Sequence, residues 1–597
     1  MVQLPSLHFS PCDVSRHVKP LQNECTLGWD NLSYTVSRRG QHSKVIINRV
    51  SGRAAPGELV AIMGPSGSGK TTLLDILADR ISSGQVTGQI DLNGRPRPVK
   101  TFRLLSSYVS QEDALTGSFT VLETLRFAAR LSVPANVLAT EREGRVQAAI
   151  DDMGLRSCEH TVVGDIFRKG LSGGQKRRLS IAIELLSKPT ILLLDEPTSG
   201  LDAASTYNVM AYIQKLCLSQ KHTVICTIHQ PSTKVYTMFA KVLVLAQGET
   251  VFFGSPHDLL LHFANIGYPC PTYSNPAEYY LSLVNTDFPG HGDVDALAGG
   301  FASSTFATHT KLQVTGDRSR SDFAPLSKAD LREMKPSVGR QFLMVLQRTA
   351  LENVRNPGIF WMRFVMFFAL SAMSGTLYLN HDHQLTDVDL VSLLFGAPAF
   401  TTFLSVAALP FFLDQRAVFS RERANSGLNV GAYAVATFVA GLPGLALLAI
   451  TTTVMVVPMT GLRGFGSFFG IMFASLTSAE SFMCVLGVLV PNAIMGIAVG
   501  SACFGMFVLT EGFMVPKPAI QPYWLWGHYL GFHTYSFEAL VANQFQGVNT
   551  PSADAVLTRF DLHDVHVGSH AGVLVGYALV LQGLGGVLLY VLHTGRR

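Results

Sequence analysis

The uneven distribution of charge along the chain is the feature that most constrains its fold. The 241 positions from Pro357 onward hold 20 Asp, Glu, Lys and Arg residues, whereas the 356 positions before Pro357 hold 68. So few charges favour a lipid environment for the C-terminal part. Because 597 residues exceed what one hydrophobic core supports, we expect a water-soluble N-terminal part and a separate membrane-embedded part.

Six apolar segments of the C-terminal part are long enough to cross about 30 Å of hydrocarbon as helices, at about 1.5 Å per residue. The third segment lies in the uncharged stretch 424–462. The sequence therefore predicts an all-α, six-helix transmembrane domain over 358–597 and a multi-pass membrane protein. The expected spans are Ile359–Leu379, Leu390–Leu413, Ala432–Met459, Gly466–Val490, Ala493–Thr510 and Ala571–His593.

The positions of Lys and Arg in the short loops predict the orientation of these spans. The loop after the second span carries Arg416, Arg421 and Arg423, and the chain ends in two arginines, whereas the segment 380–389 has neither Lys nor Arg. Because basic residues of short loops stay on the cytosolic side, we expect both termini in the cytosol. The longest extracellular segment is then 511–570.

The region 27–285 alternates short apolar runs, such as "ELVAIMG", "TILLLD" and "TVICTIH", with helical patterns. Each run ends at a loop with polar or glycine residues, as in parallel α/β sheets that place their chemistry at strand ends. We interpret 1–26 as an N-terminal tail and 286–336 as a flexible linker. For its "RSRS" we favour a solvated charge run over a kinase site. The segment 337–357 has the apolar spacing of an amphipathic connecting helix on a membrane surface.

The octapeptide "GPSGSGKT" fits the pattern G-x-x-x-x-G-K-[ST] and stands between a predicted strand and a predicted helix. In such a loop, backbone N–H groups close on phosphate oxygens, Lys70 neutralises the β and γ phosphates, and the Thr71 hydroxyl reaches magnesium. The pattern predicts a site for ATP and Mg²⁺. Its residues are Gly64, Pro65, Ser66, Gly67, Ser68, Gly69, Lys70, Thr71 and Thr72.

Catalytic residues are expected around this loop. "ILLLDEP" supplies Asp195 at a strand end for the metal ion and Glu196 to polarise the attacking water. Gln111 can sense the metal or the γ-phosphate, and His229 can hydrogen-bond the γ-phosphate. An Asp-Glu pair is often only a solvated turn, and a lone His is usually structural, but the apolar strand and the phosphate loop favour the catalytic interpretation. We predict Glu196, His229 and Gln111 as catalytic residues and Thr71, Gln111 and Asp195 as metal-binding residues.

A second glycine-rich loop, "LSGGQKRRLSIA", also precedes a helix and is suited to holding phosphate. The chain has two such loops but only one set of other nucleotide-binding residues. The sequence therefore raises the question of which nucleotide the second loop contacts. The motifs "GPSGSGKTT", Gln111, "LSGGQ", "LLLDEP", "SGLD" and His229 stand in the order found in the ATP-binding cassette (ABC) transporters, which the chain closely resembles.

In that family the second loop, called the signature loop, caps the ATP held by the other cassette of a dimer. The resemblance therefore implies that the chain is a half-transporter that dimerises and that its signature loop acts in trans. It also implies that Tyr34 stacks on adenine and that Asp202 forms the D-loop. The signature loop comprises Leu171, Ser172, Gly173, Gly174 and Gln175.

The cassette precedes the membrane domain, and segments such as "NPAEYYLSLVN" and "RERANSGLNVGAYAVATFVAGLP" resemble the G (White) subfamily of half-transporters. "NTDF" and "VPNAIMGIAVG" are most similar to the land-plant members that export cuticular lipids. The resemblance implies an α/β P-loop ATPase cassette followed by an ABC-2 type membrane domain. It further implies a plasma-membrane exporter of lipids or sterols, working as a homodimer or as a heterodimer with another G-subfamily half-transporter.

The same resemblance assigns residues of the membrane domain. Glu422 matches a position that couples the membrane domain to the cassette, with a plain surface salt bridge as the alternative. A substrate cavity is implied at the dimer axis between the second and fifth spans, although aromatic side chains in spans more often face lipid or fill packing space. The cavity positions are Phe400, Phe403, Ser501 and Gly505, and the outlet positions are Phe513 and Met514.

Two further ionisable residues lie within the predicted spans. Arg363 is near a helix start, from which its side chain can reach the interface. Glu480 is deeper, and we favour a hydrogen bond to a neighbouring helix over a proton-transfer site.

The net charge of +4 is small for 597 residues and gives no indication of nucleic-acid binding. Within the exporter class, multidrug or pigment-precursor transport is the second hypothesis. An ATP-gated regulator or channel is an alternative from another class, but the intact phosphate loop, Glu196 and signature loop favour turnover. A soluble cassette ATPase is a third hypothesis, and the six spans argue strongly against it. The substrate and the identity of the dimer partner stay open.

Overall fold

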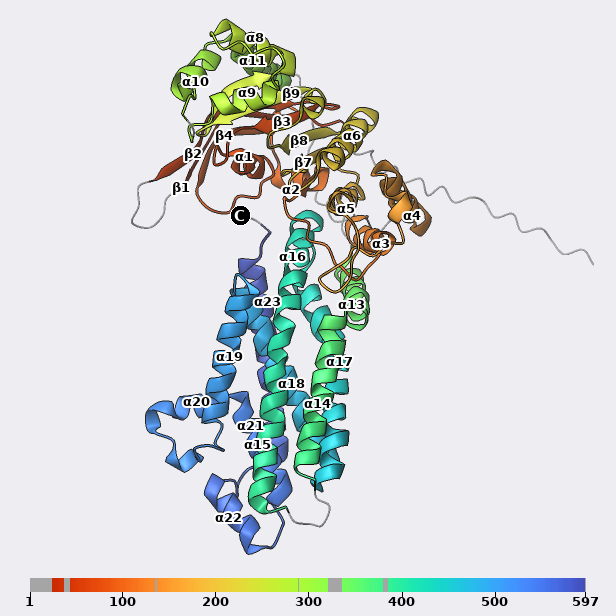
Figure 1. Ribbon diagram of the computed structural model, residues 1–597, viewed down its shortest axis with the longest axis vertical. Helices are drawn as coiled ribbons and strands as arrows, with labels where there is room; N and C mark the ends of the chain where they lie inside the picture. Colours follow the sequence, from red (N-terminus) through yellow and green to blue (C-terminus); the bar gives the residue numbers. More distant parts are fainter. Residues whose placement is uncertain are drawn as a thin grey trace, which may run out of the picture.

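The protein consists of an α/β cassette stacked on the end of a long helical bundle (Figure 1). The structure is a computed structural model. The structure describes residues 24–36, 43–134, 137–287, 289–319, 336–379 and 385–595.

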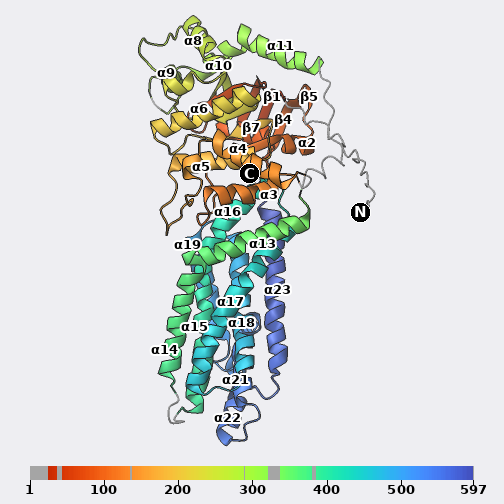
Figure 2. The same cartoon turned by 90° about the vertical axis from the view of Figure 1, so that its right-hand side faces the viewer.

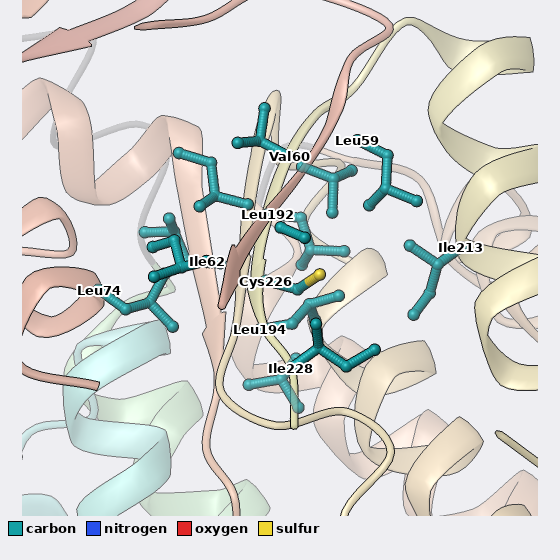
Figure 3. Close-up of a cluster of buried hydrophobic side chains, with 14 of the residues drawn as sticks. Leu59, Val60, Ile62, Leu74, Leu192, Leu194, Ile213, Cys226 and Ile228 are labelled. Atoms are coloured by element: carbon teal, nitrogen blue, oxygen red, sulfur yellow. The ribbon is translucent and has the colours of Figure 1, made fainter. Parts of the chain in front are cut away.

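The cassette is built on a six-stranded sheet in the order β10-β9-β3-β8-β7-β6. Pairing is parallel from β6 to β9, and β10 pairs antiparallel with β9. The apolar strands predicted from the sequence are fully buried, and Figure 3 shows Leu192, Leu194 and Cys226 side by side in this core. The strands are β3 (Leu59–Met63), β6 (Ser106–Val109), β7 (Ile191–Leu194), β8 (Thr223–Thr227), β9 (Lys241–Ala246) and β10 (Glu249–Gly254).

A second, antiparallel sheet in the order β2-β1-β4-β5 and a set of helices complete the cassette. Its strands are β1 (Leu27–Val36), β2 (Lys44–Ala54), β4 (Gln85–Leu92) and β5 (Arg95–Pro96). The helices are α1 (Lys70–Leu77), α2 (Val99–Leu105), α3 (Val121–Ser132), α4 (Ala139–Asp152), α5 (Gly173–Leu185), α6 (Ala203–Gln220), α7 (Thr233–Tyr236), α8 (Pro256–Asn265) and α9 (Pro276–Leu283).

The prediction of a flexible linker over 286–336 is wrong for a large part of that segment. Two helices, α10 (Val294–Ala302) and α11 (Thr305–Ser319), pack on the cassette. Phe301 of α10 contacts Phe252 of β10 edge to face, with ring centroids 5.9 Å apart. At the end of α11, Arg318 donates to Asp91 at 2.7 Å, so this arginine is not part of a solvated charge run. Ser319 ends α11, and the last two residues of the predicted run lie in 320–335, outside the described residues.

In the part of the chain that the structure describes, six helical segments are long and apolar enough to cross a membrane, which confirms the six-span prediction. The second is longer than expected. It continues through η3 to Ser426, whereas we expected a loop after Leu413. The elements are η2 (Pro357–Trp361) with α14 (Met362–Leu377), α15 (Asp387–Phe403) with η3 (Leu404–Ala408) and α16 (Leu409–Ser426), α17 (Val430–Thr460), α18 (Phe465–Leu489), α19 (Ala493–Thr510) and α23 (Val567–Leu592).

The segment 511–570, which we predict to be extracellular, forms several helices. Within it, α21 packs against α15, α18 and α23, and Phe532 and Phe537 are buried there. Figure 1 shows α21 beside the bundle helices and α22 at the far end of the molecule. The elements are η4 (Lys517–Ala519), η5 (Pro522–Trp524), α20 (Leu525–Leu530), α21 (Phe532–Phe545) and α22 (Pro551–Phe560).

The connecting helix α13 (Val338–Arg355) forms where the sequence predicts an amphipathic helix. Figure 2 shows it lying across the end of the bundle, beneath the cassette. It packs against α17 on the membrane side and α3 on the cassette side. Arg355 of α13 pairs with Glu123 of α3 at 2.8 Å, so this helix joins the two halves of the molecule.

Candidate active site

The loop between β3 and α1 has the shape of a phosphate-binding loop. Gly64 and Gly69 adopt positive φ angles of 156° and 98°. A Cβ on Gly64 would lie 2.2 Å from the Leu245 carbonyl oxygen, so this position has no room for a side chain. Lys70 Nζ donates to the carbonyls of Gly64 (2.8 Å) and Pro65 (2.9 Å), which places its charge inside the curve of the loop.

The tip of the loop is accessible and its base is buried. Ser66 and Gly67 are exposed, while Ser68 and Lys70 are buried beneath them. Burial lowers the pKa of Lys70, and the charges of Glu196 and Asp195 oppose that shift. The arrangement fits a bound polyphosphate, because backbone N–H groups at a helix start and one lysine face the same space.

The residues suited to a metal ion come together at the end of β7. Thr71 Oγ1 donates to Asp195 Oδ1 at 3.0 Å, and Thr227 Oγ1 donates to the same oxygen at 2.8 Å. Thr71 comes from α1 and Thr227 from β8, so the sheet order brings all three residues together. A hydroxyl and a carboxylate beside a phosphate loop fit Mg²⁺, which binds oxygen ligands and substrate phosphates.

The predicted catalytic residues converge on the same place. Gln111 Nε2 donates to Glu196 Oε2 at 2.9 Å, and the Glu196 amide donates to Thr227 Oγ1 at 2.8 Å. His229 Nε2 lies 3.3 Å from the Ser66 hydroxyl of the phosphate loop. Glu196 adopts a φ of 44°, a left-handed conformation that is uncommon for residues other than glycine. The arrangement can orient a water molecule at the end of a bound phosphate chain.

Arg177 of α5 is a positioning residue that the sequence analysis missed. Its guanidinium is 3% exposed and donates to the carbonyls of Asp195 (2.7 Å), Ser110 and Pro197, and to the Asp113 carboxylate (3.1 Å). It thereby ties the segment after β7 to the segment that carries the catalytic glutamine. In the sequence, Arg177 is one of three consecutive basic residues, and nothing local distinguishes it from a solvated one.

The proposed adenine-stacking role of Tyr34 does not agree with the structure. The Tyr34 side chain is buried, and its hydroxyl donates to the Ser83 carbonyl at 3.0 Å. A Cβ on Gly84 would lie 2.7 Å from the ring, so the glycine backbone covers it. The ring is held within the antiparallel sheet and has no free face for a base.

The signature loop forms the start of α5 on an exposed surface. Ser172 caps α5, since its side chain accepts from the Gln175 amide at 3.3 Å while Gln175 Oε1 accepts from the Ser172 amide at 2.9 Å. A Cβ on Gly174 would lie 3.0 Å from Ser205 Cβ, and Asp202 caps the helix of Ser205. The signature loop and the D-loop are therefore neighbours. Leu171 and Gly174 are buried, Gln175 is half-buried, and Ser172, Gly173 and Asp202 are exposed.

The residues predicted to line a substrate cavity lie on α15 and α19 and just beyond α19. Phe400 and Phe403 are 61% and 40% exposed on α15. Ser501 and Gly505 of α19 are half-buried, and the space beside Gly505 is open. These positions belong to an apolar face that this chain alone does not cover. Of the outlet positions, Phe513 is half-buried and Met514 is 55% exposed.

Glu422 lies near the end of α16 and is buried, which excludes a plain surface salt bridge. Its carboxylate forms a bidentate pair with Arg348 of α13, with one of the two N–O distances at 2.9 Å. Its neighbours make the contacts to the cassette: Arg421 donates to the Ala114 carbonyl at 2.6 Å, and Asn425 donates to a backbone carbonyl of β6 at 2.9 Å. Glu422 thus fixes α16 to α13 while adjacent residues bind the cassette.

Arg363 and Glu480 form an ion pair between α14 and α18, with N–O distances of 2.7 and 3.1 Å. Arg363 is buried, so the prediction that it reaches the membrane interface is wrong. The favoured interpretation of Glu480, a bond to a neighbouring helix, agrees with this contact.

The fold and the site together define an ATP-hydrolysing cassette coupled to a multi-pass membrane domain. Residues 47–199 match the ABC transporter family, and residues 340–545 and 229–288 match two families described as ABC-2 type transporter.

Several named relatives cover most of this chain. It is 34% identical over 561 residues to ABC transporter G family member 11 of Arabidopsis thaliana, covering 88% of this chain and 78% of that protein. The chain is 33% identical over 551 residues to ABC transporter G family member 1 of Petunia hybrida, covering 89% of this chain and 86% of that protein. It is 32% identical over 597 residues to ABC transporter G family member 22 of Dictyostelium discoideum, covering 97% of this chain and 96% of that protein.

The chain therefore belongs to the ABC transporter G family and is a half-transporter with one cassette and one membrane domain. Its cassette is an ATPase, and the protein exports substrates across a membrane.

Proposed function

We propose that this half-transporter works as a dimer in the plasma membrane, with both termini in the cytosol, and exports hydrophobic molecules such as lipids or sterols. The observation that carries the proposal is the exposed, uncharged face that Phe400 and Phe403 form on α15. A pocket built from such faces is lined by aromatic and small side chains with few polar groups, which is the lining that apolar ligands favour.

In the proposed reaction, each cassette holds ATP through the N–H groups of its phosphate loop and the ammonium of Lys70. Glu196, oriented by Gln111 and by the Thr227 hydroxyl, accepts a proton from the attacking water. Mg²⁺, held by Thr71 and Asp195, supplies positive charge to the phosphates when it is bound.

The signature loop completes the site of the partner subunit. Ser172 and Gly173 are exposed at the start of α5, the positive end of a helix, which favours an anion. Only one such loop and one phosphate loop occur in the chain, so two chains are needed for two complete ATP sites. The partner is a second copy or another G-family half-transporter.

The proposal is tested by purifying the protein from a host that expresses no partner, followed by mass spectrometry of the intact complex and of the co-purified lipids. We expect a dimer that retains apolar lipids in excess of those retained by an unrelated membrane protein purified in parallel. A monomer without ATPase activity would contradict the homodimer. A dimer whose ATPase responds to water-soluble drugs and to no lipid would favour the multidrug alternative.

A further inference from the structure

A cavity of about 460 Å³ lies in the half of the membrane domain nearer the cassette. Its walls come from α13, η2, α14, α16, α17 and α18, with one residue each from η3 and α23, whereas the predicted substrate positions Phe400 and Phe403 are not part of it. The volume falls within the range of roughly 300–1,000 Å³ that is typical of small-molecule sites. The cavity is therefore large enough for one ligand and separate from the proposed transport path.

The wall of this cavity contains one charged pair, Arg363 and Glu480. The Arg363 side chain is only 6% exposed, but that of Glu480 keeps 34% of its surface accessible. Among the described residues, the Nε donor of Arg363 is buried without a hydrogen-bond partner. Buried donors are almost always paired, so this one indicates a missing acceptor.

The rest of the lining is mainly apolar and would surround a hydrocarbon body. Large side chains of η2, α16 and α17 contribute to it: Phe360, Phe411, Phe412, Phe438, Leu445 and Leu448. A ligand that satisfies both parts of the cavity has a long apolar body and one small polar group.

The chemistry of the pair selects the kind of polar group. Arg363 can donate a hydrogen bond and Glu480 can accept one. A neutral hydroxyl does both at once, whereas a charged group is attracted by one member of the pair and repelled by the other, a carboxylate by Glu480 and an ammonium by Arg363.

We infer that this cavity binds one molecule of a hydroxylated lipid, either a long-chain alcohol or a sterol. The hydroxyl lies at the Arg363–Glu480 pair and the hydrocarbon body lies among the aromatic side chains. The cavity also reaches Ala350 and Asn353 of α13, close to the Arg348–Glu422 contact, so a bound lipid touches the helix that joins the cassette to the membrane domain.

The test uses the full-length protein in detergent and two clickable photoreactive probes, a long-chain alcohol and a sterol. After irradiation, labelled peptides are mapped by mass spectrometry. We expect adducts in α14 and α17 that an excess of unlabelled alcohol removes and that the matching fatty acid does not. The probe that labels these helices identifies which of the two lipids fits.

Two variants and a control make the result specific. Gly441 lines the cavity, and the space where its side chain would begin is open, so Gly441→Phe should fill the cavity and lower labelling about tenfold or more. Gly470 on α18 also has open space but lies outside the cavity, so Gly470→Phe should label like the parent. Glu480→Gln keeps the hydrogen bond to Arg363 but removes the negative charge, and the fatty acid should now compete.

Equal labelling of the parent and of Gly441→Phe would overturn the inference, as would adducts confined to other helices. If Gly441→Phe does not give a folded protein in a melting experiment, the Glu480→Gln competition decides. A fatty acid that competes equally well in the parent and in Glu480→Gln would refute the assignment of the hydroxyl to the ion pair.

Discussion

Glu196 is held between two partners, the Gln111 amide group and the Thr227 hydroxyl that its own backbone binds. The uncharged Gln111 amide group orients the Glu196 carboxylate, and the Thr227 hydroxyl holds the Glu196 backbone. We predict that Glu196→Gln lowers the rate of ATP hydrolysis at least about 100-fold, the usual size of general-base assistance, while ATP binding persists through the Lys70 and phosphate-loop contacts. ATPase and nucleotide-binding assays on the purified protein measure both.

Glu249→Gln in β10 of the same cassette is a matched control, because the Glu249 carboxylate accepts a hydrogen bond from Asn48, which the glutamine amide oxygen can also accept. It should hydrolyse ATP at the parental rate. Near-parental hydrolysis by Glu196→Gln would remove Glu196 from the catalytic role.

Tyr34 gives a test of the corrected adenine assignment. Because its hydroxyl bonds the Ser83 carbonyl and its ring is buried, Tyr34→Phe should cost roughly 0.5–1.5 kcal/mol of stability and leave the affinity for ATP unchanged. Thermal unfolding and titration with a fluorescent ATP analogue measure the two effects. A large loss of ATP affinity with unchanged stability would restore the stacking role.

Phe403 distinguishes cargo contact from packing. Its side chain is 40% exposed and touches Phe504 edge to face, so Phe403→Ala should cost less than the ~3–5 kcal/mol typical of a fully packed Phe. We expect normal folding and basal ATPase activity but weaker lipid stimulation. Phe368→Ala on α14, where the side chain is 51% exposed, is the control that should keep lipid stimulation. A Phe403→Ala variant with parental stimulation would exclude this residue as a cargo contact.

At the scale of elements, the contact between α13 and α16 contains a second buried carboxylate, Glu352. Burial raises the pKa of Glu352 to about 7 from an ordinary value of 4.5, and the nearby Arg348 opposes the shift. The folded state therefore favours the protonated form. The stability that this proton contributes is fully present below pH 4.5 and is lost as the pH rises through about 7.

We predict that Glu352→Gln flattens the dependence of melting temperature on pH between pH 5 and 8, roughly the window of this titration. The variant should gain stability relative to the parent at the alkaline end. Glu278→Gln, at an exposed position on α9, is the control that keeps the parental pH profile. Parallel profiles for the parent and Glu352→Gln would show that Glu352 does not titrate in this range.

Elements with strong periodicity or continuous apolar runs are predictable from the sequence, as the spans and buried strands show. The Gly, Ala, Ser and Asp content of 286–336 predicts a flexible linker, and this prediction is wrong over α10 and α11. Val294, Leu297, Ala298 and Phe301 follow helical spacing and all become buried in α10. The burial of α21 could not be read in the same way, since it depends on packing against three distant helices.

The site residues also differ in whether a local sequence pattern identifies them. The phosphate loop and Asp195 follow local patterns, and the sequence predicts them correctly as neighbours. The partners of Arg177, Arg363 and Glu422 lie far away in the sequence, so no local pattern identifies them. Arg363 and Glu480, for example, are 117 positions apart.

For the whole molecule, the decisive property is that one chain carries one phosphate loop and one exposed signature loop. We predict that mixing a Lys70→Ala chain with a Ser172→Arg chain restores ATP hydrolysis. If the signature loop acts across subunits, both lesions fall on one ATP site of the heterodimer, and the other site has intact Lys70 and intact Ser172. Each homodimer has lesions in both sites and should be inactive. The heterodimer is isolated with two affinity tags, and its ATPase rate is compared with the rates of both homodimers.

Inactive heterodimers would mean that the two sites are obligately coupled or that the trans arrangement is wrong. Cysteine cross-linking between Ser66 of one chain and Gly173 of the other, both exposed here, separates these outcomes, because only a trans arrangement brings them together.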